Sequence, residues 1–96
     1  MSSFLLSHEA RQDILDIWDF IAQDNADAAD RVTAEIRSAI LKLAKFPELG
    51  HLRRDLADEP LRFWRVHSYL IVYRPKRSPL EIVRILSGYR DIEKLL

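Results

Sequence analysis

The residues of this chain whose types could do chemistry are one tyrosine–arginine group and three isolated histidines. Tyr89 is followed by Arg90 and lies five residues after Arg84, just beyond the end of a predicted strand. A phenol with guanidinium groups can hold a phosphate or supply a proton to a leaving oxygen. The same group can bind the carboxylates of a partner or stack on a helix, and we favour that interpretation over chemistry.

The three histidines lack the companions that a metal site would need. His8 falls in the first turn of a predicted helix, His51 in a charged loop, and His67 at a predicted hairpin end, where a solvated histidine is the commoner case. The chain has no cysteine, which removes disulfides and thiolate chemistry and suits a reducing cytoplasm. We therefore predict no catalytic residue, no metal and no cofactor.

Length and charge limit the possible partners. The 96 residues predict a single domain over 1–96, with room for a modest core. No apolar run approaches the ~20 residues of a membrane span and no signal peptide is evident, so we expect a cytoplasmic protein without membrane contact. Residues 1–59 carry 7 Lys and Arg against 12 Asp and Glu, whereas residues 60–96 carry 8 against 3. The basic second half predicts an acidic peptide or a nucleic acid as partner.

The first half of the chain predicts a strand followed by two helices. Phe4-Leu5-Leu6 is typical of a pairing strand, and Ser7 is typical of a helix N-cap. Apolar residues at helical spacing predict helices over about 8–23 and 26–45, and Pro47 ends the second. Because their connection is short, the helices should form an antiparallel hairpin that covers one face of a sheet.

The second half predicts a three-stranded antiparallel meander after a charged loop. Its last two strands are apolar at successive positions, a pattern typical of strands covered on both faces. The fold class is therefore α+β: an N-terminal strand, an antiparallel helical hairpin, then the meander. The predicted loop covers 51–60, the strands cover 61–67, 69–74 and 80–87, and the turns fall at 67–68 and 75–79.

Strand parity separates the two faces of this meander. In its middle strand Ile71 and Tyr73 share one face, whereas Leu70, Val72 and Arg74 share the other. Because burying an unpaired guanidinium is costly, we assign the arginine face to the side that the helices leave open. Apolar residues exposed there would form a patch typical of an interface. The residues predicted to bind a partner are the exposed apolar set Leu70, Val72, Ile82 and Leu86 and the basic set Arg65, Arg74 and Arg84.

Several short motifs follow one another in a fixed order along the chain. They are Leu5-Leu6-Ser7, Ile17-Trp18, Phe46-Pro47-Glu48-Leu49-Gly50, Arg53, Arg62, the runs 69–74 and 81–86, and Gly88-Tyr89-Arg90-Asp91. Their order resembles the ParE branch of the ParE/RelE toxin superfamily of bacterial type II toxin–antitoxin systems. The resemblance implies a RelE/ParE-like fold, a cognate antitoxin of ParD type whose disordered C-terminal segment folds along the toxin, and DNA gyrase as the target. Tyr89 and Arg90 are then candidate target-binding residues.

The resemblance also admits the RelE activity, which is ribosome-dependent mRNA cleavage. RelE-like nucleases commonly carry an arginine in the middle strand, where this chain has Leu70, and a tyrosine or histidine near the C-terminus, where it has neither after Tyr89. One missing charge stabiliser can cost about 3 kcal/mol in a transition state. We therefore expect a protein-directed gyrase inhibitor, with the endoribonuclease as the alternative. A binding module that has lost its toxicity stays open as a third hypothesis.

Overall fold

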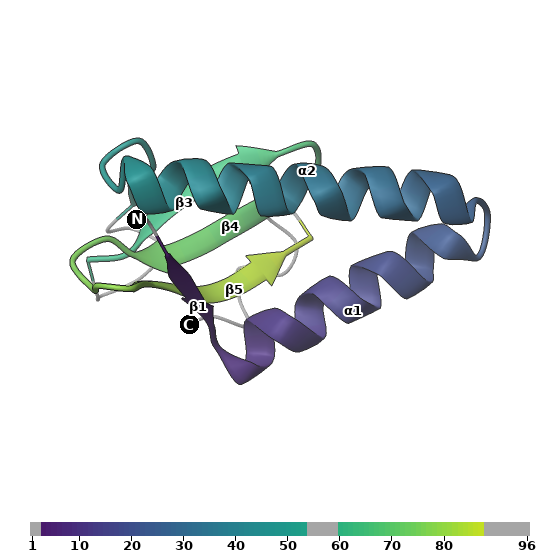
Figure 1. Cartoon of the computed structure of the whole chain (residues 1–96), viewed down its shortest axis with the longest axis horizontal. Coiled ribbons are helices and arrows are strands. Elements are labelled where there is room, and N and C mark those ends of the chain that lie inside the picture. The colour runs from purple at the N-terminus through teal and green to yellow at the C-terminus, as the bar shows by residue number, and fades with distance from the viewer. Residues whose placement is uncertain (1–2, 54–59, 88–96) are drawn as a thin grey trace.

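The computed structural model describes residues 3–53 and 60–87, which form two helices and a five-stranded sheet (Figure 1). The predicted α+β class is confirmed, and the helix and strand ends fall within one residue of their predicted positions. A two-residue strand, β2, lies where a loop was predicted. The elements are β1 (Phe4–Leu6), α1 (His8–Ala22), α2 (Ala26–Lys45), β2 (His51–Leu52), β3 (Arg62–Val66), β4 (Tyr69–Arg74) and β5 (Leu80–Leu86).

The sheet has the strand order β1-β5-β4-β3-β2. β1 runs parallel to β5, and the other neighbours are antiparallel, so the predicted meander is confirmed with β4 at its centre. Among the described residues, the first and last strands, β1 and β5, therefore lie side by side. Both helices lie over one face of the sheet, and they spread apart from their connecting turn toward β1 (Figure 1).

Side-chain caps set where each helix begins. The Ser7 Oγ accepts the Ala10 N–H at 2.9 Å and donates to the Val83 carbonyl at 2.6 Å, so one hydroxyl starts α1 and also ties it to β5. The Asn25 side chain accepts the Ala28 N–H at 3.0 Å and starts α2. Each contact satisfies an N–H that the first helical turn leaves without a partner.

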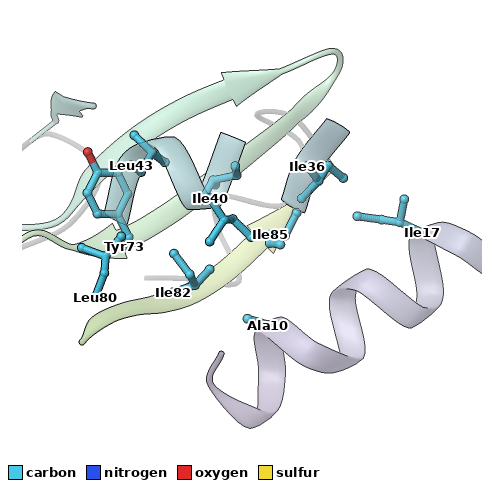
Figure 2. Close-up of a cluster of buried hydrophobic side chains, with 10 residues drawn as sticks. Ala10, Ile17, Ile36, Ile40, Leu43, Tyr73, Leu80, Ile82 and Ile85 are labelled. Atoms are coloured by element: carbon cyan, nitrogen blue, oxygen red, sulfur yellow. The ribbon is translucent and has the colours of Figure 1, made fainter. Parts of the chain in front are cut away.

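The main hydrophobic core lies between the helices and the sheet (Figure 2). Tyr73 is the largest fully buried side chain, and its ring packs in this cluster while its hydroxyl reaches the cluster's edge. Burial of this apolar surface supplies the main driving force for docking the helical hairpin on the sheet. The buried members are Ala10, Ile17, Ile36, Ile40, Leu43, Ile71, Tyr73, Leu80, Ile82 and Ile85.

A second cluster occupies the opposite face of the meander. Its register confirms the predicted split of β4, because Val72 pairs with Phe63 and faces away from the helices while Ile71 faces them. Both faces of β4 are therefore buried, which explains why its sequence is apolar at every position from 70 to 73. The buried members are Leu61, Phe63, Leu70, Val72 and Leu86, with Val83 packed against them.

A β-bulge between β4 and β5 changes which residues share a face. Val72 pairs with Arg84, but the next residue, Tyr73, pairs with Ile82, so Val83 is the extra residue. One extra residue inverts the alternation of side chains beyond it. Ile82 therefore belongs to the helix-facing core, and its predicted place beside Leu86 on the open face is wrong.

Candidate functional site

The predicted exposed apolar patch on the sheet does not exist in the folded chain. Leu70, Val72 and Leu86 do lie on the face away from the helices, but only 5%, 0% and 1% of their surfaces are accessible. Phe63 of β3 and Leu61, the residue just before that strand, belong to the same cluster, and parity within β4 and β5 alone could not place them there. The prediction of exposure is wrong for all four apolar residues, and their role in binding a partner stays a prediction.

Arg84 is held at the edge of the sheet by an acidic residue of the first helix. Its Nε and Nη2 donate to the two Asp13 carboxylate oxygens at 2.8 and 2.9 Å. Asp13 also accepts the Ile85 N–H at 2.9 Å, so it caps the edge of β5 beyond the point where β1 ends. A bidentate pair of this kind fixes geometry as well as charge. Arg84 therefore joins α1 to β5, and its predicted contact with a partner stays a prediction.

The other two arginines predicted to bind a partner also have partners within the chain. Arg74 donates to the Glu81 carboxylate at 2.6 Å, across the paired strands β4 and β5. Arg65 is exposed, and its Nε donates to the His67 carbonyl at 2.8 Å. These contacts keep the guanidinium groups in place beside the sheet, while the binding role of Arg65 and Arg74 remains a prediction.

His51, His67 and the strand tryptophan make contacts with other parts of the fold. His67 lies in the β3–β4 turn with φ 55° and contacts Glu35 of α2. The His51 and Trp64 rings stack with centroids 6.3 Å apart, and the Lys42 ammonium lies 5.8 Å from the Trp64 centroid. Trp64 packs half-buried against the main core. These contacts tie α2 to the β2–β3 side of the sheet.

The remaining residues considered for target or metal binding are only partly covered by the structure. Tyr89 and Arg90 lie outside the described residues. Within residues 3–53 and 60–87, no three His, Cys, Asp or Glu side chains form a group that could hold a metal ion. Over the same residues, neither helix combines the length and apolar character that crossing a membrane requires.

A buried tyrosine anchors the loop that follows α2. The Tyr73 hydroxyl accepts the Gly50 N–H at 2.8 Å and donates to the Pro47 carbonyl at 2.7 Å. Arg62 Nη1 donates to the Gly50 carbonyl at 2.6 Å. Burial raises the pKa of the Tyr73 hydroxyl, while the Gly50 hydrogen bond and the Arg62 charge partly oppose that rise. The sheet thus holds the 46–50 loop through the side chains of Tyr73 and Arg62, and no sequence motif indicated this connection.

A groove that was not predicted from the sequence opens between the two helices above β1. It has a volume of about 350 Å³. The two helices on either side of it diverge toward β1 (Figure 1). Its floor comes from β1, which lies at the edge of the sheet. The alternation of side chains in β1 could have indicated that Phe4 and Leu6 point to the same face. The angle between the helices, which opens the groove, could not be predicted. The groove is lined by Phe4, Leu6, Ile14, Asp30, Thr33, Ala34, Arg37 and Ile40.

Comparisons with known proteins identify the family and agree with the observed fold. A sequence model described as the ParE toxin of the type II toxin–antitoxin system parDE matches residues 4–92. A solved structure titled as the chromosomal ParDE toxin–antitoxin system from P. aeruginosa is similar, with a TM-score of 0.73 and 20% sequence identity, over 92% of this chain and 97% of that chain. No curated protein matches the sequence. At that identity the structural likeness establishes the fold alone, whereas the family match spans most of the chain. The chain therefore belongs to the ParE toxin family of type II toxin–antitoxin systems.

Proposed function

We propose that this toxin inhibits DNA gyrase and is neutralised by a cognate antitoxin of ParD type. The observation that carries the proposal is the family match over residues 4–92. The match supports a toxin that acts by binding a protein target. Such a toxin needs a surface complementary to its target and does not need a catalytic group of its own. The cellular outcome expected for such a toxin is stalled gyrase with broken DNA.

The middle strand supports inhibition over mRNA cleavage. Cleavage of this type needs a cation at the phosphate to stabilise the charge of the transition state. At the position where RelE-like nucleases commonly place an arginine, β4 has Leu70, and the Leu70 side chain is buried in the second cluster. That position therefore presents no cation to a bound phosphate.

For the antitoxin, we place the binding segment in the groove between α1 and α2. The face predicted from strand parity has its apolar residues buried, whereas this groove is open and combines apolar walls with charged residues. Phe4, Leu6 and Ile14 can receive the apolar face of an amphipathic helix. Arg37, an exposed residue of the same wall, can pair with a carboxylate of that helix.

The gyrase proposal is tested with the purified toxin in two assays run side by side. We expect loss of gyrase supercoiling with accumulation of cleaved DNA, and no cuts in a translated message mapped by primer extension with ribosomes. Adding the antitoxin should restore supercoiling. Codon-positioned cuts with normal supercoiling would instead establish the endoribonuclease, and no effect in either assay would favour a binding module without toxicity.

The antitoxin site is tested by filling the groove. Ala34 is exposed and lines it, so Ala34→Trp should obstruct the antitoxin without disturbing the core. Ser38→Trp places the same side chain on an exposed position of α2 that does not line the groove, and it serves as the matched control. We expect Ala34→Trp to weaken antitoxin binding by about tenfold or more, equivalent to about 1.4 kcal/mol, with Ser38→Trp unchanged. Equal affinities for the two variants would move the antitoxin away from this groove.

A further inference from the structure

A second hollow lies at the turn between β4 and β5. This turn is at the end of the sheet away from the α1–α2 turn (Figure 1). Its volume is about 260 Å³. Three of its lining residues are apolar and three are basic, so the hollow combines a hydrophobic wall with a cationic rim. The apolar residues are Pro60, Leu61 and Pro75, and the basic residues are Arg74, Lys76 and Arg77.

The wall of this hollow is built from residues with little freedom to move. Leu61 is buried in the second cluster. Arg74 is held by Glu81 at 2.6 Å, and the Arg77 N–H donates to the Arg74 carbonyl at 3.5 Å, which closes the turn. The ring of Pro75 fixes the backbone between them. The part of the wall formed by Leu61, Arg74 and Pro75 is therefore in place before a ligand arrives, which lowers the entropic cost of binding.

The rim of the hollow has more positive charge than the described residues neutralise. The Arg74 charge is balanced by Glu81, but Lys76 and Arg77 are exposed and have no ion-pair partner among the described residues. Exposed cations contribute little to stability. Two of them beside an apolar wall instead attract an anion and orient it there.

We propose that this hollow binds an acidic peptide segment of a protein partner, with a carboxylate between Lys76 and Arg77 and a neighbouring apolar side chain against Pro60 and Pro75, which remain accessible there. A peptide is favoured over nucleic acid, because none of the residues that line the hollow is aromatic and could serve as a stacking platform for a base. The hollow is separate from the groove between the helices, since the two share no lining residue.

The test measures binding of short labelled peptides to the full-length toxin by fluorescence anisotropy. The probe is a hexapeptide that alternates glutamate and leucine, with one matched peptide in which glutamine replaces glutamate and another in which serine replaces leucine. A single-stranded oligothymidine tests the nucleic-acid alternative. We expect the acidic peptide to bind, both matched peptides to bind at least about fivefold more weakly, and the oligonucleotide to bind more weakly than the acidic peptide.

Charge reversal at the rim locates the site. Lys76→Glu/Arg77→Glu should raise the Kd of the acidic peptide about tenfold or more. Arg11→Glu/Arg31→Glu makes the same change in net charge at exposed positions of the two helices and should leave the Kd within about twofold. The proposal is overturned if the acidic peptide does not bind, if the glutamine peptide binds as tightly, if both double variants weaken binding equally, or if the oligonucleotide binds most tightly and loses that affinity in Lys76→Glu/Arg77→Glu.

Discussion

The loop over 46–50 and the turn over 75–79 both depend on proline, yet the fold treats their polar groups in opposite ways. In the loop, the Tyr73 hydroxyl joins the backbone of Pro47 and Gly50, and Arg62 binds the Gly50 carbonyl. In the turn, one backbone hydrogen bond of 3.5 Å closes the chain, and two cations face the solvent. Buried hydrogen bonds support stability, whereas exposed unpaired charges are available to a partner. The loop therefore serves the stability of the fold, whereas the turn carries the binding site proposed above.

The largest effect is expected at Gly50, where the loop contacts the tyrosine most closely. A Cβ atom on Gly50 would lie 2.8 Å from Cε1 of Tyr73 and closer still to its hydroxyl oxygen. Gly50→Ala must therefore push the ring or the loop away and break the hydrogen bonds between them, for a loss of about 3 kcal/mol in the free energy of unfolding. Urea denaturation measures this loss. A loss below about 0.5 kcal/mol would mean that the loop moves freely, contrary to the comparison.

Removing only the hydroxyl tests the two hydrogen bonds of the tyrosine. Tyr73→Phe keeps the buried ring but leaves the Gly50 N–H and the Pro47 carbonyl without this partner. We expect a loss of about 2 kcal/mol in the free energy of unfolding. Combining it with Gly50→Ala should cost less than the sum of the two, because the two changes disrupt the same contact. Strictly additive losses would show that the contact is not shared.

The titration of the same hydroxyl predicts a loss of stability at alkaline pH. Burial raises the pKa of Tyr73 above its value of about 10 in an unfolded chain. The folded state therefore holds this proton more tightly, so the stabilisation is complete below pH about 10 and is lost as the pH rises through the folded pKa. The difference in unfolding free energy between the wild type and Tyr73→Phe should shrink above that pH. A difference that grows with pH would reverse the assigned direction.

The smallest effect on stability is expected at the β4–β5 turn. Lys76→Ala/Arg77→Ala removes two exposed charges that have no ion-pair partner among the described residues. The free energy of unfolding should change by less than about 0.5 kcal/mol, while binding of the acidic peptide weakens. A substantial loss of stability with intact peptide binding would give the turn a structural role like that of the loop.

Much of the fold could be predicted because its signals are local. Ser7 and Pro47 mark the start of the first helix and the end of the second, and each acts on backbone groups within a few residues. The both-faced apolar pattern of β4 also predicted correctly that this strand is covered on both sides. What failed was the exposure of the second face, where Phe63 of β3 and the preceding Leu61 join Leu70, Val72 and Leu86 in one buried cluster. Alternation along one strand carries no information about its neighbour's contribution.

The sequence by itself determined the class of the fold, the extent of the helices and the family. Periodicity and caps depend on residues close together in the chain, and the order of the motifs can be read directly along it. Only the tertiary structure decided which residues meet across the fold. The bulge at Val83 placed Ile82 in the core, Asp13 met Arg84 over 71 positions of sequence, and the divergence of the helices opened the groove. These features depend on strand register and helix packing, which arise from the sum of many contacts between distant residues and which no short motif encodes.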